Sequence, residues 1–157
     1  MNKKGFTLIE LIIVIAIIAI LAAISFVAVN PAKRIGEAND DQRWADVISI
    51  AEAWEKYETD TGGEYPNGWN YADSDTEIMQ IGTSSGVDVC DAVAVGGNPI
   101  NITLQGLVDN GYLGSIPVDP LGADTNGNTN YYFQKSGGIV TVGACITYGT
   151  GAIVVSR

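Results

Sequence analysis

The chain has 157 residues, of which 46% are hydrophobic, and a formal net charge of −10 from eighteen acidic and eight basic residues. An acidic chain argues against direct nucleic-acid binding, which needs a basic face to displace counterions. The sequence contains no histidine, so it has no Ser–His or Cys–His pair, and it also has no phosphate-binding glycine loop. We therefore do not expect an enzyme.

The first thirty residues carry a short basic leader and then an apolar run. Lys3 and Lys4 precede Gly5, and the 19 residues from Leu11 to Val29 would span roughly 28 Å as a helix, about one bilayer core. Glu10 lies near the start of this run, where a carboxylate at bilayer depth costs about 2.5–3.5 kcal/mol even on lenient scales. A secretory signal peptide or a plain membrane anchor explains the apolar run but not Glu10. We therefore expect this carboxylate to have a partner.

The stretch Gly5-Phe6-Thr7-Leu8-Ile9-Glu10, followed by the apolar run, resembles the class III leader of type IV pilins and pseudopilins. The resemblance implies that a prepilin peptidase cuts between Gly5 and Phe6 and N-methylates Phe6. Residues 1–5 are then the leader, and residues 6–30 are a retained transmembrane and assembly helix. The resemblance further implies that Glu10 pairs with the N-terminal amine of a neighbouring copy, which would neutralise both charges and fix the register of the copies.

Residues 31–157 are expected to form a globular head. Asn30-Pro31 predicts a bend, because proline suits a first helical turn and breaks a helix interior. An amphipathic helix is predicted over 32–60. Its apolar face is expected to contain Trp44, Val47, Ile48, Ala51, Trp54 and Tyr57, and its polar face Glu37, Asp41, Asp46, Glu52, Glu55 and Lys56.

Residues 62–101 are rich in glycine, asparagine, aspartate and serine and predict a long irregular loop. Three aromatic residues lie in it: Tyr65, Trp69 and Tyr71. They either pin the loop to the head or form a binding or subunit-contact surface. A short helix is predicted over 102–110, ending at Gly111.

The last part of the chain predicts an antiparallel sheet. Strands are expected at Asn130–Gln134, Gly138–Tyr148 and Gly151–Ser156, with Val140, Val142, Ala144 and Ile146 facing the helix. The preceding segment Ile116–Gly122 (Ile-Pro-Val-Asp-Pro-Leu-Gly), with Tyr131-Tyr132, resembles the segment before the sheet in pseudopilins and in many Gram-positive or thermophile pilins. The fold class predicted is therefore α+β, with a long N-terminal helix packed on a C-terminal antiparallel sheet of three to four strands, and the resemblance implies that this is the type IV pilin fold.

Two further sites are predicted in the head. The alternation places Cys145 on the outer side of the sheet, and two cysteines in an exported head favour a Cys90–Cys145 disulfide over two buried thiols. Asp124, Asn126 and Asn128 are spaced like the first half of a calcium loop, but Lys135 stands where a closing glutamate would be. A turn rich in asparagine and glycine is therefore favoured over a calcium site, and no other cofactor is expected.

These features together predict a structural subunit of a type IV pilus-like filament. An alternative is a pseudopilin of a type II secretion system, and a further one is a membrane-tethered or secreted binding module. The partners implied are identical or related copies in a homo-oligomeric filament, a prepilin peptidase, and the inner-membrane assembly machinery. The precursor would be a single-pass cytoplasmic-membrane protein with its head outside, and the assembled form a cell-surface pilus or a periplasmic pseudopilus.

Overall fold

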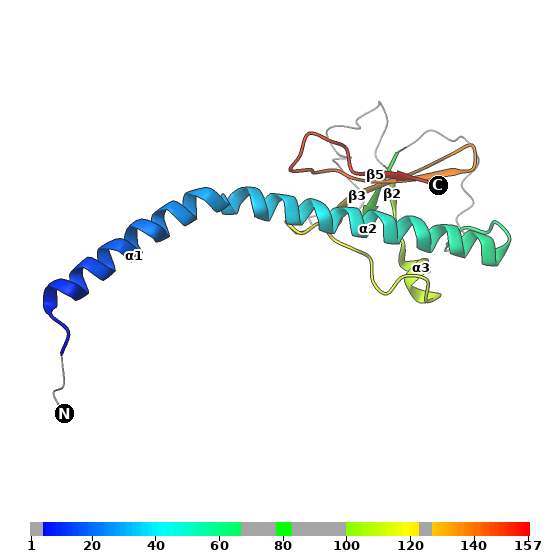
Figure 1. The fold of residues 1–157 in the computed structure, drawn as a ribbon. Coiled ribbons are helices and arrows are strands. Elements are labelled where there is room, and N and C mark those ends of the chain that lie inside the picture. The colour runs from blue at the N-terminus through cyan, green and yellow to red at the C-terminus, as the bar shows by residue number, and fades with distance from the viewer. Residues whose placement is uncertain (1–4, 67–77, 83–99, 123–126) are drawn as a thin grey trace. The chain divides into compact units, whose positions relative to one another are not determined.

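A computed structural model describes residues 5–66, 78–82, 100–122 and 127–157 (Figure 1). The chain forms two compact units, Met1–Gly36 and Glu37–Arg157. Each unit is described by itself.

The first unit contains helix α1 and the first residues of α2, with one break between them. Helix α1 spans Leu8–Val29 and is followed by Asn30, whose φ of 43° and ψ of 75° place it in the left-handed region. Helix α2 spans Pro31–Thr61, so proline occupies its first position, where a missing N–H costs no helical hydrogen bond. The side-chain Oδ1 of Asn30 accepts a hydrogen bond from the backbone N–H of Lys33 (3.3 Å) and so caps the new helix. The break predicted at Asn30-Pro31 is confirmed.

The second unit is built around a five-stranded sheet of strand order β2-β1-β3-β4-β5. The strands are β1 (Met79–Gly82), β2 (Ile100–Ile102), β3 (Asn128–Ser136), β4 (Ile139–Ala144) and β5 (Val154–Ser156), and a short helix α3 covers Gln105–Asp109. Strands β1, β3, β4 and β5 pair antiparallel, whereas β1 and β2 pair parallel. The expected α+β arrangement with a four-strand antiparallel sheet is confirmed, with β2 as an addition.

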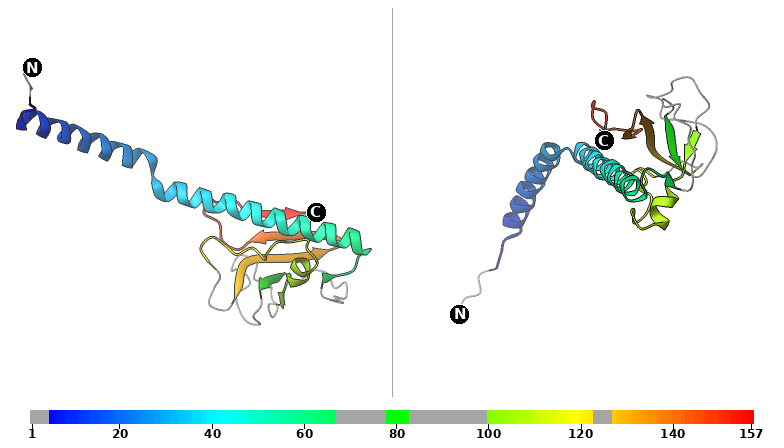
Figure 2. Two further views of the ribbon diagram at one scale, coloured as in Figure 1. Left: turned by 90° about the horizontal axis from the view of Figure 1, so that it is seen from below. Right: turned by 90° about the vertical axis from the view of Figure 1, so that its right-hand side faces the viewer.

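Helix α2 lies across one face of the sheet (Figure 2). Val47, Ile50 and Trp54 of α2 are buried in one cluster with Phe133 of β3 and Val142 of β4. The rings of Trp54 and Phe133 contact each other in a tilted arrangement, with a centroid distance of 4.4 Å and an interplanar angle of 46°. The burial of this apolar stripe against the sheet is the main force that holds the second unit together.

Several predicted boundaries were wrong, and the reasons are tertiary. The predicted irregular loop 62–101 contains β1 and begins β2, because four-residue and three-residue strands leave no periodic signal of their own. Ile102 belongs to β2, so the predicted helix 102–110 shortens to α3. Strand β4 ends at Ala144 rather than Tyr148, and Ile146, predicted to face the helix, is exposed.

The buried face of α2 is turned relative to the predicted one. Trp44 and Ile48, predicted as core, are 40% and 37% exposed, whereas Arg43 and Asp46 are buried. Both polar residues find partners on the sheet and on the segment before it, which allows them to replace apolar side chains in the interface. The prediction that Asp46 lies on the polar face of the helix was therefore wrong.

Candidate assembly site

The predicted cleavage position lies outside regular secondary structure. Gly5 and Phe6 precede α1, both are exposed, and the side chain of Phe6 is 89% exposed. A peptidase needs an extended, accessible segment, and this stretch offers one. Met1 to Lys4, which include the two leader lysines, lie outside the described residues.

Glu10 closes a capping box at the start of α1. Its Oε2 accepts hydrogen bonds from the backbone N–H of Thr7 (2.8 Å) and from the Thr7 hydroxyl (2.7 Å), and the Thr7 Oγ1 accepts from the Glu10 N–H (3.3 Å). This reciprocal arrangement satisfies helix N-terminal donors and places the acidic charge at the positive end of the helix dipole. Glu10 accepts both of these bonds from Thr7 at Oε2, and its other oxygen, Oε1, accepts neither.

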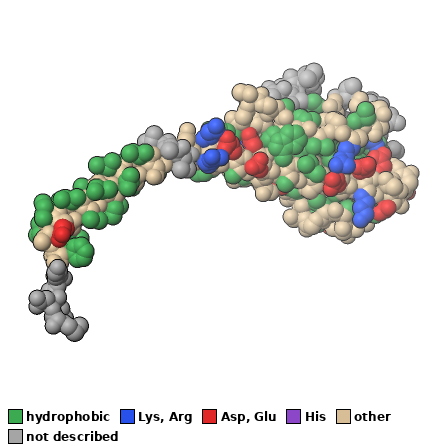
Figure 3. Space-filling view, viewed as in Figure 1, with side chains coloured by type: hydrophobic (Ala, Val, Ile, Leu, Met, Phe, Trp, Pro, Cys, Tyr) green, Lys and Arg blue, Asp and Glu red, His purple; other side chains and the backbone are tan. Residues whose placement is uncertain are grey.

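The rest of α1 is apolar on every side. Figure 3 shows hydrophobic side chains along the visible face of this helix and an acidic side chain near its start. Within the described part of the chain, one helical stretch, Leu8–Phe26, is long and apolar enough to cross a membrane. None of this stretch is buried by the chain itself. A secretory signal sequence has a similar length and composition. Such a surface requires lipid or other apolar helices to cover it.

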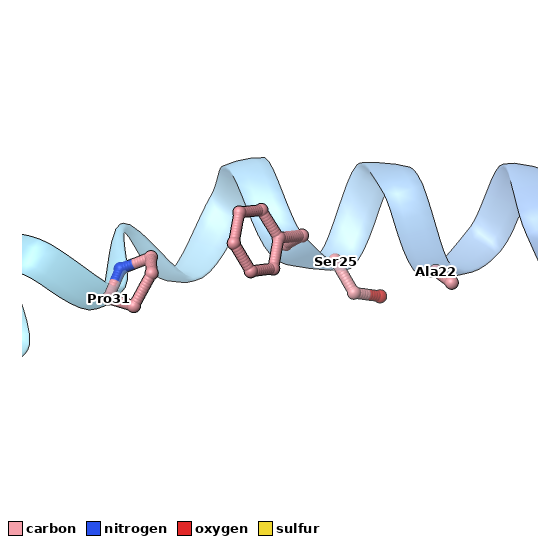
Figure 4. A pocket seen from close by; sticks show the side chains of 4 residues that line it. Ala22, Ser25 and Pro31 are labelled. Carbon is pink, nitrogen blue, oxygen red and sulfur yellow. The ribbon is translucent and has the colours of Figure 1, made fainter.

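A shallow apolar hollow of about 340 Å³ lies beside the helix break (Figure 4). It is lined by Ala22, Ser25, Phe26 and Pro31. The hydroxyl of Ser25 donates to the carbonyl of Leu21 (2.9 Å), so this polar side chain is satisfied within the helix and adds no donor to the hollow.

In the second unit, a buried ion-pair cluster joins α2 to the segment before β3. The guanidinium of fully buried Arg43 donates to both carboxylate oxygens of Asp119 (Nε–Oδ2 2.6 Å, Nη2–Oδ1 3.0 Å) and through Nη1 to Asp40 (2.7 Å). The bonds to Asp119, and then those to Asp40, raise the pKa of Arg43 although burial opposes them. Asp119 also accepts from the backbone N–H of Leu121 (2.8 Å), which orders the turn after Pro120.

Asp40 holds the turn between β4 and β5. Its carboxylate accepts from the backbone N–H groups of Tyr148 (2.9 Å to Oδ1) and Gly149 (3.0 Å to Oδ2). Burial raises the pKa of Asp40, but the two backbone donors and the Arg43 guanidinium outweigh it, so the pKa is lowered overall. These bonds draw the chain toward α2, which explains why β4 stops before the predicted end.

Asp46 pairs with the hydroxyl of Tyr131 (2.6 Å), and both groups are buried. Burial and the neighbouring carboxylate raise the pKa of Tyr131. Sequence reasoning missed Arg43 and Asp46. A signal for Arg43 did exist, since residues 43, 47, 50 and 54 follow helical spacing and place the arginine within the apolar stripe.

The remaining predicted sites are only partly described. Tyr65 packs on the core, with its ring 6.0 Å from that of Trp54 and under the ammonium of Lys135 (4.7 Å to the centroid). It therefore pins the loop to the head, whereas Trp69 and Tyr71 lie outside the described residues.

The same holds for the two other predicted sites of the head. Cys145 follows β4 and is half-buried, but Cys90 lies outside the described residues, so the disulfide stays a prediction. Of the calcium-loop residues, Asn128 is buried at the start of β3, while Asp124 and Asn126 are not described. In the described ranges, no group of three or more histidine, cysteine, aspartate or glutamate residues is placed to hold a metal ion.

A protein-family model matches residues 1–26 of the chain. The matching family model is described as the prokaryotic N-terminal methylation motif. No curated protein and no solved structure matches the chain. This motif is the class III prepilin leader of type IV pilins and pseudopilins, which are structural proteins, so it supports a pilin-like or pseudopilin-like protein processed by a prepilin peptidase.

Proposed function

We propose that the chain is a structural subunit of a type IV pilus-like filament. The prepilin peptidase would cut at Gly5–Phe6 and methylate Phe6, and the helix that begins at Leu8 would then associate with the same helix of other copies. The observation that carries the proposal is Glu10, a carboxylate at the start of an apolar helix and four residues from the amine that cleavage would free.

The electrostatics favour association in a fixed register. A positive α-amino group on Phe6 and a negative Glu10 would each be costly in a bundle of apolar helices. When the amine of one copy contacts Glu10 of the next, both charges are compensated. Loss of one partner of such a buried pair typically costs about 3–5 kcal/mol. Because Oε2 accepts both Thr7 bonds, Oε1 can take the incoming amine without opening the capping box.

Two substitutions separate the local role of Glu10 from its role between copies. Glu10→Gln keeps an oxygen that can accept from Thr7 but removes the charge, and Glu10→Ala removes both. We expect both variants to be exported, to reach membranes at wild-type abundance and to yield few sheared filaments in electron microscopy. Ser25→Ala is the control, since that hydroxyl bonds only within its own helix in the described contacts. Wild-type filament yield from Glu10→Gln would refute the pairing.

The mature N-terminus tests the proposal independently. Mass spectrometry should find a chain that begins with N-methylated Phe6. An intact Met1, or a cut at the far end of the apolar run, would instead support the tethered or secreted binding module.

A pseudopilin of a type II secretion system is the second candidate. The segment Ile116–Gly122, whose Asp119 is buried against Arg43, is compatible with it, because the segment resembles that of pseudopilins as well as that of many pilins. Long filaments in preparations sheared from cells, with this chain as their main component, would favour a pilus. Processed chain retained in the periplasmic fraction would favour the pseudopilin.

A further inference from the structure

The outer face of α2 carries a small apolar surface. Trp44 and Ile48 lie one helical turn apart and are 40% and 37% exposed, although both are large apolar residues. Figure 3 shows a hydrophobic area on the head with charged side chains to either side. Trp44 and Ile48 are called the α2 patch below.

The rim of the α2 patch is acidic. Asp41, exposed, lies on the helical turn before the patch. Glu52 and Glu55, both exposed, lie on the turns after it and share the guanidinium of Arg157 (3.0 Å and 3.3 Å). Three carboxylates around one guanidinium leave this rim with a negative charge.

The head as a whole is also acidic. Residues 37–157 hold seventeen of the eighteen acidic residues of the chain and four of its eight basic residues, a net charge of −13. Heads of neighbouring copies therefore repel one another wherever carboxylates meet. Two α2 patches placed face to face would bring their rims together, so a contact of the patch with itself is disfavoured. The occupant of the patch should instead be apolar and should bring no exposed carboxylate.

One turn of the head meets both conditions. Residues 110–122 contain a single charged residue, Asp119, which is buried within an ion pair. The turn Asp119–Gly122, called the Leu121 turn below, presents Leu121, which at 67% is the most exposed large apolar residue of the described head. Val118, 45% exposed, lies directly before this turn.

Hydrogen bonds hold the Leu121 turn in one shape. The carboxylate of Asp119 accepts from the N–H of Leu121 (2.8 Å), and its carbonyl accepts from the N–H of Gly122 (2.7 Å). The side chain of Asn130 donates to the carbonyl of Gly122 (3.0 Å). Pro120 restricts the backbone further, and the φ of 97° at Gly122 suits glycine. An apolar side chain on such a braced turn loses little conformational freedom when it binds.

The buried ion-pair cluster joins the turn to the patch. Arg43 directly precedes Trp44 in α2 and donates to the Asp119 carboxylate of the turn (2.6 Å and 3.0 Å). Both surfaces are therefore tied to one buried group. A contact made at one of them orients the other for the next contact.

We propose that the Leu121 turn of one copy docks on the α2 patch of a second copy. Leu121 would cover Trp44 and Ile48, and Val118 would extend the contact. The inference rests on the proposed function, because it describes how the heads of neighbouring subunits meet. Since turn and patch are different surfaces, each copy offers its turn to one neighbour and its patch to another, as an open fibre requires.

Cross-linking in full-length, processed chains tests the docking. Two variants, Val118→Cys and Ile48→Cys, are co-expressed with wild-type chain, which maintains filament assembly, and sheared filaments are treated with a short bismaleimide. A dimer that joins positions 118 and 48 should form only when both variants are present. The matched control replaces Ile48→Cys by Ile139→Cys, an exposed isoleucine at the start of β4, and should give about tenfold less dimer. Each variant alone controls for reaction at the native cysteines.

Two substitutions of Leu121 test the role of the acidic rim. Leu121→Glu and Leu121→Lys, each added to the Val118→Cys copy, both remove the apolar side chain and keep the backbone N–H that donates to Asp119. Leu121→Glu would bring a further carboxylate to the rim, whereas Leu121→Lys would bring the opposite charge. Leu121→Glu should therefore lower the dimer yield by about tenfold, and Leu121→Lys by clearly less. Asp41→Lys in the Ile48→Cys copy should reverse this order.

The outcomes separate this inference from the proposed function. Normal filaments in which the 118–48 pair cross-links no better than the 118–139 pair, or in which Leu121→Glu and Leu121→Lys have equal effects, would overturn the docking alone. Cross-linking of the Val118→Cys copy to a different protein only would assign the turn to another partner and also overturn it. Absence of filaments from the wild-type chain, or an uncut leader, would refute the proposed function, and the docking with it.

Discussion

Substitution of Arg43 by methionine should destabilise the head more than any loss of a surface ion pair. Arg43 is buried and donates to Asp119 and Asp40 through three nitrogen atoms. Methionine would remove the charge and leave the Asp119 carboxylate buried without its main partner, which typically costs about 3–5 kcal/mol. Asp119 keeps the bond from the Leu121 N–H, so we expect the lower end of this range, or a fall in Tm of roughly 10 °C.

The matched control is Arg157→Met. Arg157 also contacts two carboxylates, Glu52 and Glu55, but it is exposed, and pairs of this kind contribute about 0.2–1 kcal/mol. Urea unfolding of the full chain in detergent micelles, followed by tryptophan fluorescence, measures both variants. Adding Asp119→Asn to Arg43→Met should recover part of the loss, since it removes the uncompensated charge. Equal losses from Arg43→Met and Arg157→Met would refute the reasoning that burial sets the value of these pairs.

Three further predictions concern the second unit. Asp40→Ala should speed hydrogen exchange of the Tyr148 amide, measured by mass spectrometry, because that amide loses its acceptor; unchanged exchange would contradict this. In wild type, the same amide should lose protection from exchange as the pH falls below about 4. The pKa of Asp40 is lower in the folded than in the unfolded protein, so the stabilisation that its carboxylate gives is present above the unfolded pKa and is lost when the group is protonated. Gly143→Ala should cost about 1–3 kcal/mol in urea unfolding, because a Cβ would lie 2.3 Å from the Tyr132 ring, whereas Gly114→Ala, with nothing within 4 Å, should cost much less.

The parts of the fold that sequence could predict are those with a local signal. Proline after asparagine marked the helix break, and the alternation of Val140 and Val142 marked the strand that faces α2. The capping box could also have been found, because threonine three residues before glutamate at the start of an apolar helix is its usual form. In each case neighbouring residues alone fix the geometry.

What sequence could not predict depends on partners far along the chain. Arg43 and Asp119 are 76 residues apart, and Asp46 and Tyr131 are 85 apart. Hydropathy assigns both acids to solvent, and only the fold brings to them the groups that make burial tolerable. For the same reason Trp44 was predicted as core: the arginine beside it takes the interior position, and the tryptophan is left at the surface.

This exchange of a tryptophan for an arginine links the interior of the head to its surface. A buried ion-pair cluster is weak evidence for stability, because replacement of all its members together by apolar side chains of similar volume is often neutral, although loss of a single member is costly. Because Arg43 occupies the interior position, Trp44 and Ile48 face outward, and its second bond, to Asp40, orders the carboxylate that accepts from the Tyr148 N–H. The ion-pair cluster therefore sets which face of α2 is exposed. On this reasoning, the cluster matters more for the surface that the head presents than for the free energy of its folding.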